Sequence, residues 1–205
     1  MKYRKIYILM TQYPGFDAKI LRLRTRFPYT HTSVGLEEDM DTFYTFVSKG
    51  YLVESITRYE KPGRPSFPCA LYEIIVTDEV YEKVKKMVHD YKARKTMLKY
   101  STLGVIMCFL KIPLKRKNHY FCSQFVAEVL HKCKVLKLKK RSTLYFPKDI
   151  SQHKELKLIS TVLSQKWTAV AGGASLPDSC LTHSVSPTSK PAVCLFAGGP
   201  SVGHP

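Results

Sequence analysis

The sequence predicts an α+β fold in which a small antiparallel sheet packs against helices. Five short segments rich in β-branched and aromatic residues precede residue 78, and the longest helical pattern begins only after them. Strand and helix patterns are therefore segregated along the chain rather than alternating. A chain of 205 residues with 44% hydrophobic content can bury one substantial core. We expect a single globular domain.

The predicted strands are separated by residues typical of turns. The acidic segment 37–41 predicts a hairpin turn between the second and third strands, and Gly50 predicts a bend before the fourth. Neighbouring strands are therefore expected to be antiparallel. The five segments are KIYILMT (5–11), THTSVGLE (30–37), TFYTFVS (42–48), YLVESIT (51–57) and LYEIIVT (71–77).

Helical periodicity follows the fifth predicted strand. Thr77 is a good N-cap, an acidic first turn comes next, and apolar residues recur at three- and four-residue steps as far as Tyr91. Segment 101–110 fits either a mostly buried helix or an apolar strand, and its pattern leaves both open. A helix after Phe121 and a last strand near 156–160 complete the ordered part.

The composition changes near Trp167. Beyond it the only charged side chains are Asp178 and Lys190, and Gly, Ser and Pro are frequent without any periodicity. This predicts an ordered domain over residues 1–167 and a disordered tail over residues 168–205. Because the two tail charges cancel, the whole net charge of +17 belongs to the ordered part.

The positive charge predicts an anionic partner, such as phospholipid, nucleic acid or an acidic polymer. The sequence has no finger, helix-turn-helix or RNP-type signature, so nucleic acid is the less favoured partner. Lysine-rich runs at 83–99, 111–117 and 131–141 are either solvated faces or, taken together, a surface for an anionic membrane.

Cysteine usage and the N-terminus predict a cytoplasmic protein, with peripheral attachment to a membrane surface as an extension. The six cysteines form no CxxC pair, which indicates reduced thiols. Thr11 and Gln12 interrupt the first apolar run, so no signal peptide is expected. No apolar run reaches the ~20 residues that a membrane-spanning helix needs.

Cys122 heads a predicted helix whose apolar residues recur on one stripe as far as Cys133. Unpaired backbone N–H groups and the helix dipole in a first turn favour the thiolate, which is the reactive form of cysteine. Cys133, on the last turn, meets the opposite field. Both cysteines are equally explained as small core hydrophobes, and position alone leaves the two interpretations open.

A nucleophilic cysteine needs a general base. His31, at the start of a predicted strand, and His119, in a loop beside the helix start, are the candidates. A structural hydrogen bond is the alternative explanation for a strand histidine. The remaining histidines lie in the tail (His183, His204) or in lysine-rich helical segments that are expected to be solvated (His89, His131, His153).

Four stretches carry a likeness to a known family: YTHTSVGL (29–36), TFYTF (42–46), YFCSQFVAEVL (120–130) and LYFPKDI (144–150). Together they resemble the circularly permuted branch of the NlpC-type papain-like cysteine hydrolases, the YiiX-like group. In that branch the histidine strand precedes the cysteine helix, as it does here, and the likeness covers roughly residues 3–160. The resemblance implies a circularly permuted, papain-like hydrolase domain over 1–167, with His31 as base and Cys122 as nucleophile.

The resemblance also implies a third catalytic residue, which is polar and lies on the strand after the histidine. The matching position is Thr45. Threonine can hydrogen-bond an imidazole but cannot stabilise imidazolium as a carboxylate does, so Glu37, Ser48 and Glu54 are alternatives. Thr45 is also explained as a β-branched strand residue.

The implied activity is that of an acyl hydrolase or acyltransferase, which cleaves an amide, ester or thioester through a thioester intermediate on Cys122. The acyl substrate would be a small molecule, a lipid or a peptide, and the resemblance implies no metal or organic cofactor. The alternative is a catalytically inactive basic protein of the same fold, bound to an anionic membrane or nucleic acid. The salt dependence would distinguish the two functions, because binding to phosphate groups weakens steeply as the salt concentration rises, whereas chemistry at Cys122 need not.

Overall fold

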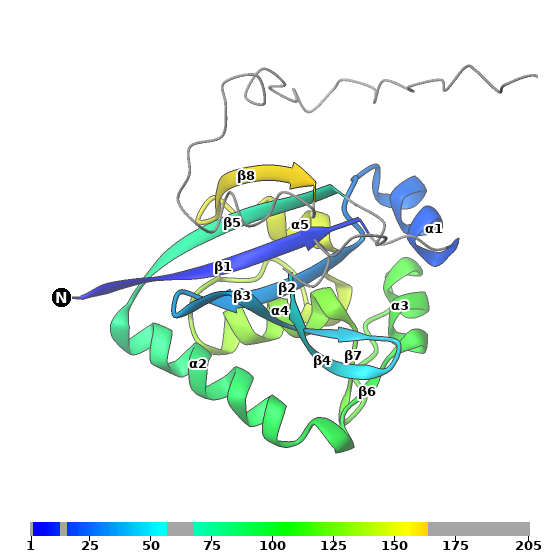
Figure 1. Ribbon diagram of the computed structural model, residues 1–205. Coiled ribbons are helices and arrows are strands. Elements are labelled where there is room, and N and C mark those ends of the chain that lie inside the picture. The colour runs from blue at the N-terminus through cyan, green and yellow to red at the C-terminus, as the bar shows by residue number, and fades with distance from the viewer. Residues whose placement is uncertain (1, 13–15, 57–67, 164–205) are drawn as a thin grey trace, which may run out of the picture. The chain divides into compact units, whose positions relative to one another are not determined.

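The computed structural model describes residues 2–12, 16–56 and 68–163. These residues belong to one compact unit, Met1–Ala174. A second unit, Ser175–Pro205, lies outside the described residues, and so does the predicted 168–205 tail. Within the described part, the α+β class and the antiparallel sheet are confirmed (Figure 1).

Six strands form one sheet with the order β4-β3-β2-β1-β5-β8, and every neighbouring pair is antiparallel. Each of the predicted strands is present. A further two-stranded parallel sheet was not predicted, because its strands of two residues are too short to show a pattern. The strands are β1 (Tyr3–Thr11), β2 (His31–Leu36), β3 (Asp39–Val47), β4 (Gly50–Ser55), β5 (Pro68–Thr77), β6 (Lys99–Tyr100), β7 (His119–Tyr120) and β8 (Lys157–Leu163).

The helices begin close to the predicted positions. Thr77 caps α2, since its hydroxyl accepts a hydrogen bond from the backbone N–H of Val80. Segment 101–110 is helical, and Ser101 caps α3 through the N–H of Gly104 at 3.1 Å. The α-helices are α1 (Phe16–Thr25), α2 (Asp78–Ala93), α3 (Thr102–Phe109), α4 (Cys122–Lys132) and α5 (Pro147–Ser151), with 3₁₀ turns η2 (Lys95–Met97) and η3 (Ser142–Leu144). In the described ranges, no helix is long and apolar enough to cross a bilayer.

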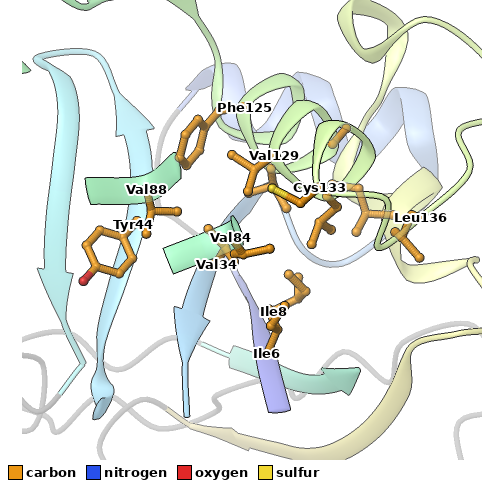
Figure 2. Packing of buried hydrophobic residues seen from close by; sticks show 14 of the residues in the cluster. Ile6, Ile8, Val34, Tyr44, Val84, Val88, Phe125, Val129, Cys133 and Leu136 are labelled. Carbon is orange, nitrogen blue, oxygen red and sulfur yellow. The ribbon is translucent and has the colours of Figure 1, made fainter. Parts of the chain in front are cut away.

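Helices α2 and α4 pack on one face of the sheet and enclose the larger core (Figure 1). Figure 2 shows Ile8 and Val34 of the sheet facing Val84 of α2 and Val129 of α4. The other face carries a smaller cluster, made of Tyr7, Leu9, Phe43, Ile56, Cys69 and Leu71.

Helix α4 is buried on all sides over its first nine residues, Cys122–Leu130, and not only along the predicted apolar stripe. Two of its polar side chains have partners, whereas the buried Nε2 of Gln124 has no hydrogen-bond partner among the described residues. The hydroxyl of Ser123 donates to the carbonyl of Tyr145 at 2.6 Å, and Glu128 pairs with Lys132 at 2.6 Å and with Lys115. The helix is therefore enclosed between the sheet and the η3–α5 segment, which fixes the position of its N-terminus.

Candidate active site

Three polar side chains meet on three consecutive strands of the sheet. His31 begins β2, Thr45 lies on β3 and Glu54 lies on β4. Glu54 is directly opposite Phe43, and Thr45 is two residues from Phe43, so Thr45 and Glu54 share one face. The antiparallel register thus brings Thr45, which is 14 positions from His31 in the sequence, to the His31 ring. It also brings Glu54, which is further away in the sequence, to the same ring.

The hydrogen bonds of Thr45 show which nitrogen of the His31 ring carries a proton. The hydroxyl of Thr45 donates its one hydrogen to the carbonyl of Thr32 at 2.8 Å. It must therefore accept at its 3.1 Å contact with His31 Nε2, which carries the proton. Glu54 Oε1 lies 3.7 Å from the same nitrogen. Nδ1 is the ring nitrogen left to face a further partner.

That partner is Cys122, the first residue of α4, whose thiol hydrogen-bonds the His31 side chain. The backbone N–H groups of Thr32 and Ser123 also donate to the sulfur. The Thr32 donor comes from the sheet, and the Ser123 donor belongs to the first helical turn, where N–H groups have no partner within the helix. Cys122 and His31 are buried, with exposed fractions of 7% and 6%.

Each member of the pair shifts the pKa of the other. Burial raises the pKa of Cys122, but the charge and hydrogen bond of His31, together with the two backbone donors, outweigh burial and lower it. Burial lowers the pKa of His31, but Cys122 and then Glu54 outweigh burial and raise it. Both shifts favour a thiolate paired with an imidazolium.

The other described cysteines differ from Cys122 in this respect. Burial raises the pKa of Cys69 and of Cys108 to about 12, and it also raises the pKa of Cys133. Of the four cysteines in the described ranges, Cys122 alone has a lowered pKa. It is therefore the one poised for nucleophilic chemistry.

The structure discriminates among the candidates for the third residue. It brings both Thr45 and Glu54 to the His31 ring. Glu37 instead accepts a hydrogen bond from Arg4 at 2.9 Å, and Ser48 is exposed in the turn after β3. Glu54 was one of three alternatives in the sequence, and the signal that selects it is strand register rather than residue type.

The other histidines lie elsewhere. His119, on β7, donates Nδ1–H to the carbonyl of Lys117 at 2.7 Å. His89 and His131 are exposed, as expected. The expectation of a solvated His153 is wrong: its ring is buried and stacks on Tyr145, with Nε2 3.2 Å from the tyrosine hydroxyl. The His153 side chain is buried in the turn after α5, although lysines lie near it in the sequence.

A hollow of about 540 Å³ is a second feature of this region, and the sequence did not indicate it. It is lined by parts of α1, α3, η3 and α5 and the residues that flank them, together with Lys111 and Lys140. Neither Cys122 nor His31 lines it, but its wall includes Cys108, whose pKa is raised first by burial and also by the charge of Cys122.

No group of three or more His, Cys, Asp or Glu side chains in the described ranges could hold a metal ion. Comparison of the chain with protein-family models found no match. A search among curated proteins found no match either.

Proposed function

We propose that this protein is a cysteine-dependent acyl hydrolase or acyltransferase of the circularly permuted, papain-like NlpC type. The observation that carries the proposal is the hydrogen-bonded pair of Cys122 and His31, with opposite pKa shifts and with Thr45 and Glu54 behind the imidazole. The order of histidine strand before cysteine helix agrees with the permuted branch. A cytoplasmic location, with or without contact to a membrane surface, belongs to the same proposal.

The chemistry follows from the ion pair. The Cys122 thiolate attacks the carbonyl carbon of an amide, ester or thioester, and the carbonyl electrons move to the oxygen. The backbone N–H of Cys122, at the positive end of α4, stabilises that oxyanion. His31 gives its Nδ1 proton to the leaving group, and a thioester on Cys122 results. Water or another acceptor then attacks the thioester, transfers a proton to His31 and releases the thiolate.

Thr45 and Glu54 together fill the role of the third catalytic residue: Thr45 orients the imidazole and Glu54 stabilises its charge. The Thr45 hydroxyl accepts from Nε2–H and thereby fixes the ring so that Nδ1 faces the sulfur. The Glu54 carboxylate stabilises the imidazolium charge, which threonine cannot do. Glu54 therefore supplies the acidic character that the position of Thr45 lacks.

The low exposure of Cys122, and its absence from the walls of the hollow, favour a second candidate. In this second function the protein has the same fold but is catalytically inactive, and its basic surface binds an anionic partner. Reactivity at the thiol separates the two functions.

The test is labelling with an acyl-transferring electrophile, such as an activated thioester, followed by mass spectrometry of the adduct. Wild-type protein is expected to carry the acyl group on Cys122, and His31→Ala to carry far less. Cys133→Ala is the matched control, because Cys133 is a buried thiol at the other end of the same helix. Acylation that persists in Cys122→Ala, or a wild-type protein that stays unlabelled, contradicts the hydrolase.

A further inference from the structure

The charged side chains that line the hollow are mainly cationic. Four cationic side chains line it, against the single carboxylate of Asp149. Lys140 pairs with Asp149 at 2.9 Å, and Lys148 donates to the carbonyl of Thr25 at 3.0 Å. Arg24 and Lys111 form no ion pair with any carboxylate in the described ranges. Two uncommitted cations that converge on one hollow are suited to a phosphate group.

The residues next to these two cations are apolar and exposed. Leu23 precedes Arg24 and is 83% exposed, and Leu110 precedes Lys111 and is 60% exposed. On α3, Ile106 lies one turn before Leu110 and is 49% exposed, so an aliphatic stripe leads toward the hollow. The opposite side of α3 is buried against the protein. An exposed aliphatic stripe next to basic residues is typical of surfaces that enter a lipid interface.

The charge around α3 selects the partner. Between Asp90 and Glu128 the sequence has no acidic residue. A second copy of the chain would bring the same positive charge to the contact, whereas an anionic bilayer complements it. The basic residues in this interval are Lys92, Arg94, Lys95, Lys99, Lys111, Lys115, Arg116 and Lys117.

We propose that the hollow between α1 and α3 binds the phosphate group of an anionic membrane lipid, while Leu23, Ile106 and Leu110 enter the bilayer interface. Arg24 and Lys111 bind the phosphate, and the aliphatic side chains hold the molecule on the surface. This proposal goes beyond the acyl-transfer function and does not depend on it, since no step of that chemistry uses the hollow.

Cosedimentation with lipid vesicles tests the site. Vesicles of phosphatidylcholine alone are compared with vesicles that also contain phosphatidylglycerol, and binding is expected only to the latter. Arg24→Gln/Lys111→Gln should weaken binding about thirtyfold. Lys49→Gln/Lys86→Gln removes the same charge from exposed positions outside both the hollow and the interval between Asp90 and Glu128, and should change binding less than about threefold. An equal loss in both pairs would show diffuse electrostatic attraction and overturn the proposal.

The apolar contribution has its own matched pair. Ile106→Ser/Leu110→Ser should weaken binding to anionic vesicles about tenfold. Leu158→Ser/Ile159→Ser alters two exposed aliphatic residues on β8, away from the hollow, and should leave binding unchanged. If the β8 pair loses as much as the α3 pair, the docking face is wrongly placed.

Two further measurements separate the alternatives. Soluble glycerol phosphate at millimolar concentration should not displace the protein from vesicles; complete displacement would mean that a soluble phosphate ester occupies the hollow, against the proposal. Cys122→Ala should bind vesicles like the wild type. Vesicle binding can therefore fail while acylation of Cys122 succeeds, or succeed while acylation fails. The lipid-binding proposal and the acyl-transfer proposal are thus tested independently.

Discussion

Cys122 acquires its chemistry from groups that lie far from it in the sequence. The imidazole of His31 and the N–H of Thr32 come from the sheet, while the N–H of Ser123 comes from the first turn of its own helix. Burial alone would make this thiol as inert as Cys69, whose pKa burial raises to about 12. The charge of His31 is what reverses the effect of burial.

We predict that Cys122 reacts fastest among the thiols with limiting iodoacetamide at pH 6. Its lowered pKa gives Cys122 a larger thiolate fraction than thiols whose pKa is raised, and its reaction slows as pH falls through that lowered pKa. His31→Ala removes the charge that lowers this pKa, so the rate at pH 6 should fall at least about tenfold. Peptide mapping identifies the alkylated residue. Faster labelling of Cys69, Cys108 or Cys133 would sink the assignment.

We predict that Glu54→Gln lowers the pKa of His31, because the carboxylate is one of the groups that raise it. The imidazolium then loses its proton at a lower pH, and the alkaline limit of acyl transfer moves down with it. Titration of the His31 ring followed by NMR measures the shift directly. Glu37→Gln is the control: Glu37 pairs with Arg4, so its loss should leave the His31 titration in place. Equal titrations in wild type and Glu54→Gln would remove Glu54 from the site.

At the scale of the element, α4 connects the core to the site. Phe125, one turn after Cys122, lies among aromatic rings with centroid separations of 5.2 Å to Phe46, 5.7 Å to Tyr51 and 5.0 Å to Tyr91. This cluster fixes the helix against the sheet, and thereby fixes the sulfur near His31.

We predict that Phe125→Ala lowers the free energy of unfolding by about 3–5 kcal/mol, the usual loss for a buried phenylalanine that leaves a cavity. Chemical denaturation at constant pH measures it. Phe109→Ala on α3 is the control, because that ring is only half-buried and packs on Phe146 alone among the described aromatic rings. A similar loss in both variants would mean that the aromatic cluster does not fix α4.

At the scale of the whole molecule, the sheet ends at β8, which pairs with β5 from Pro68 to Glu73. β8 is the last described element, and it is the edge strand on one side of the sheet. The predicted end of the ordered domain at residue 167 lies outside the described ranges. The tail prediction rests on composition alone.

We predict that truncation after Trp167 leaves the melting temperature nearly unchanged, because a segment without apolar periodicity cannot offset the entropy of ordering. Truncation before Lys157 should lower it by several degrees, because β5 loses its ladder to β8. Differential scanning calorimetry compares the two. A large drop after the first truncation would show that residues beyond Trp167 contribute to stability.

Local patterns were sufficient for much of this protein. Segments rich in β-branched and aromatic residues predicted the strands of the main sheet, the cap at Thr77 predicted the start of α2, and the stripe that begins at Cys122 predicted α4. Each of these signals depends on residues within a few positions of one another, so a single sequence contains them. The pairing of His31 with Cys122, in contrast, required a family resemblance, since nothing local relates residues that far apart.

The sequence by itself determined the fold class and the basic charge, and it offered Cys122 and His31 as candidates for the site. Tertiary structure alone decided the rest: that Glu54 as well as Thr45 reaches His31, that His153 is buried, and that a basic hollow lies between α1 and α3. The physical reason is common to all three. Strand register and helix packing are set by the total burial of the chain, so which polar side chains meet depends on every element at once.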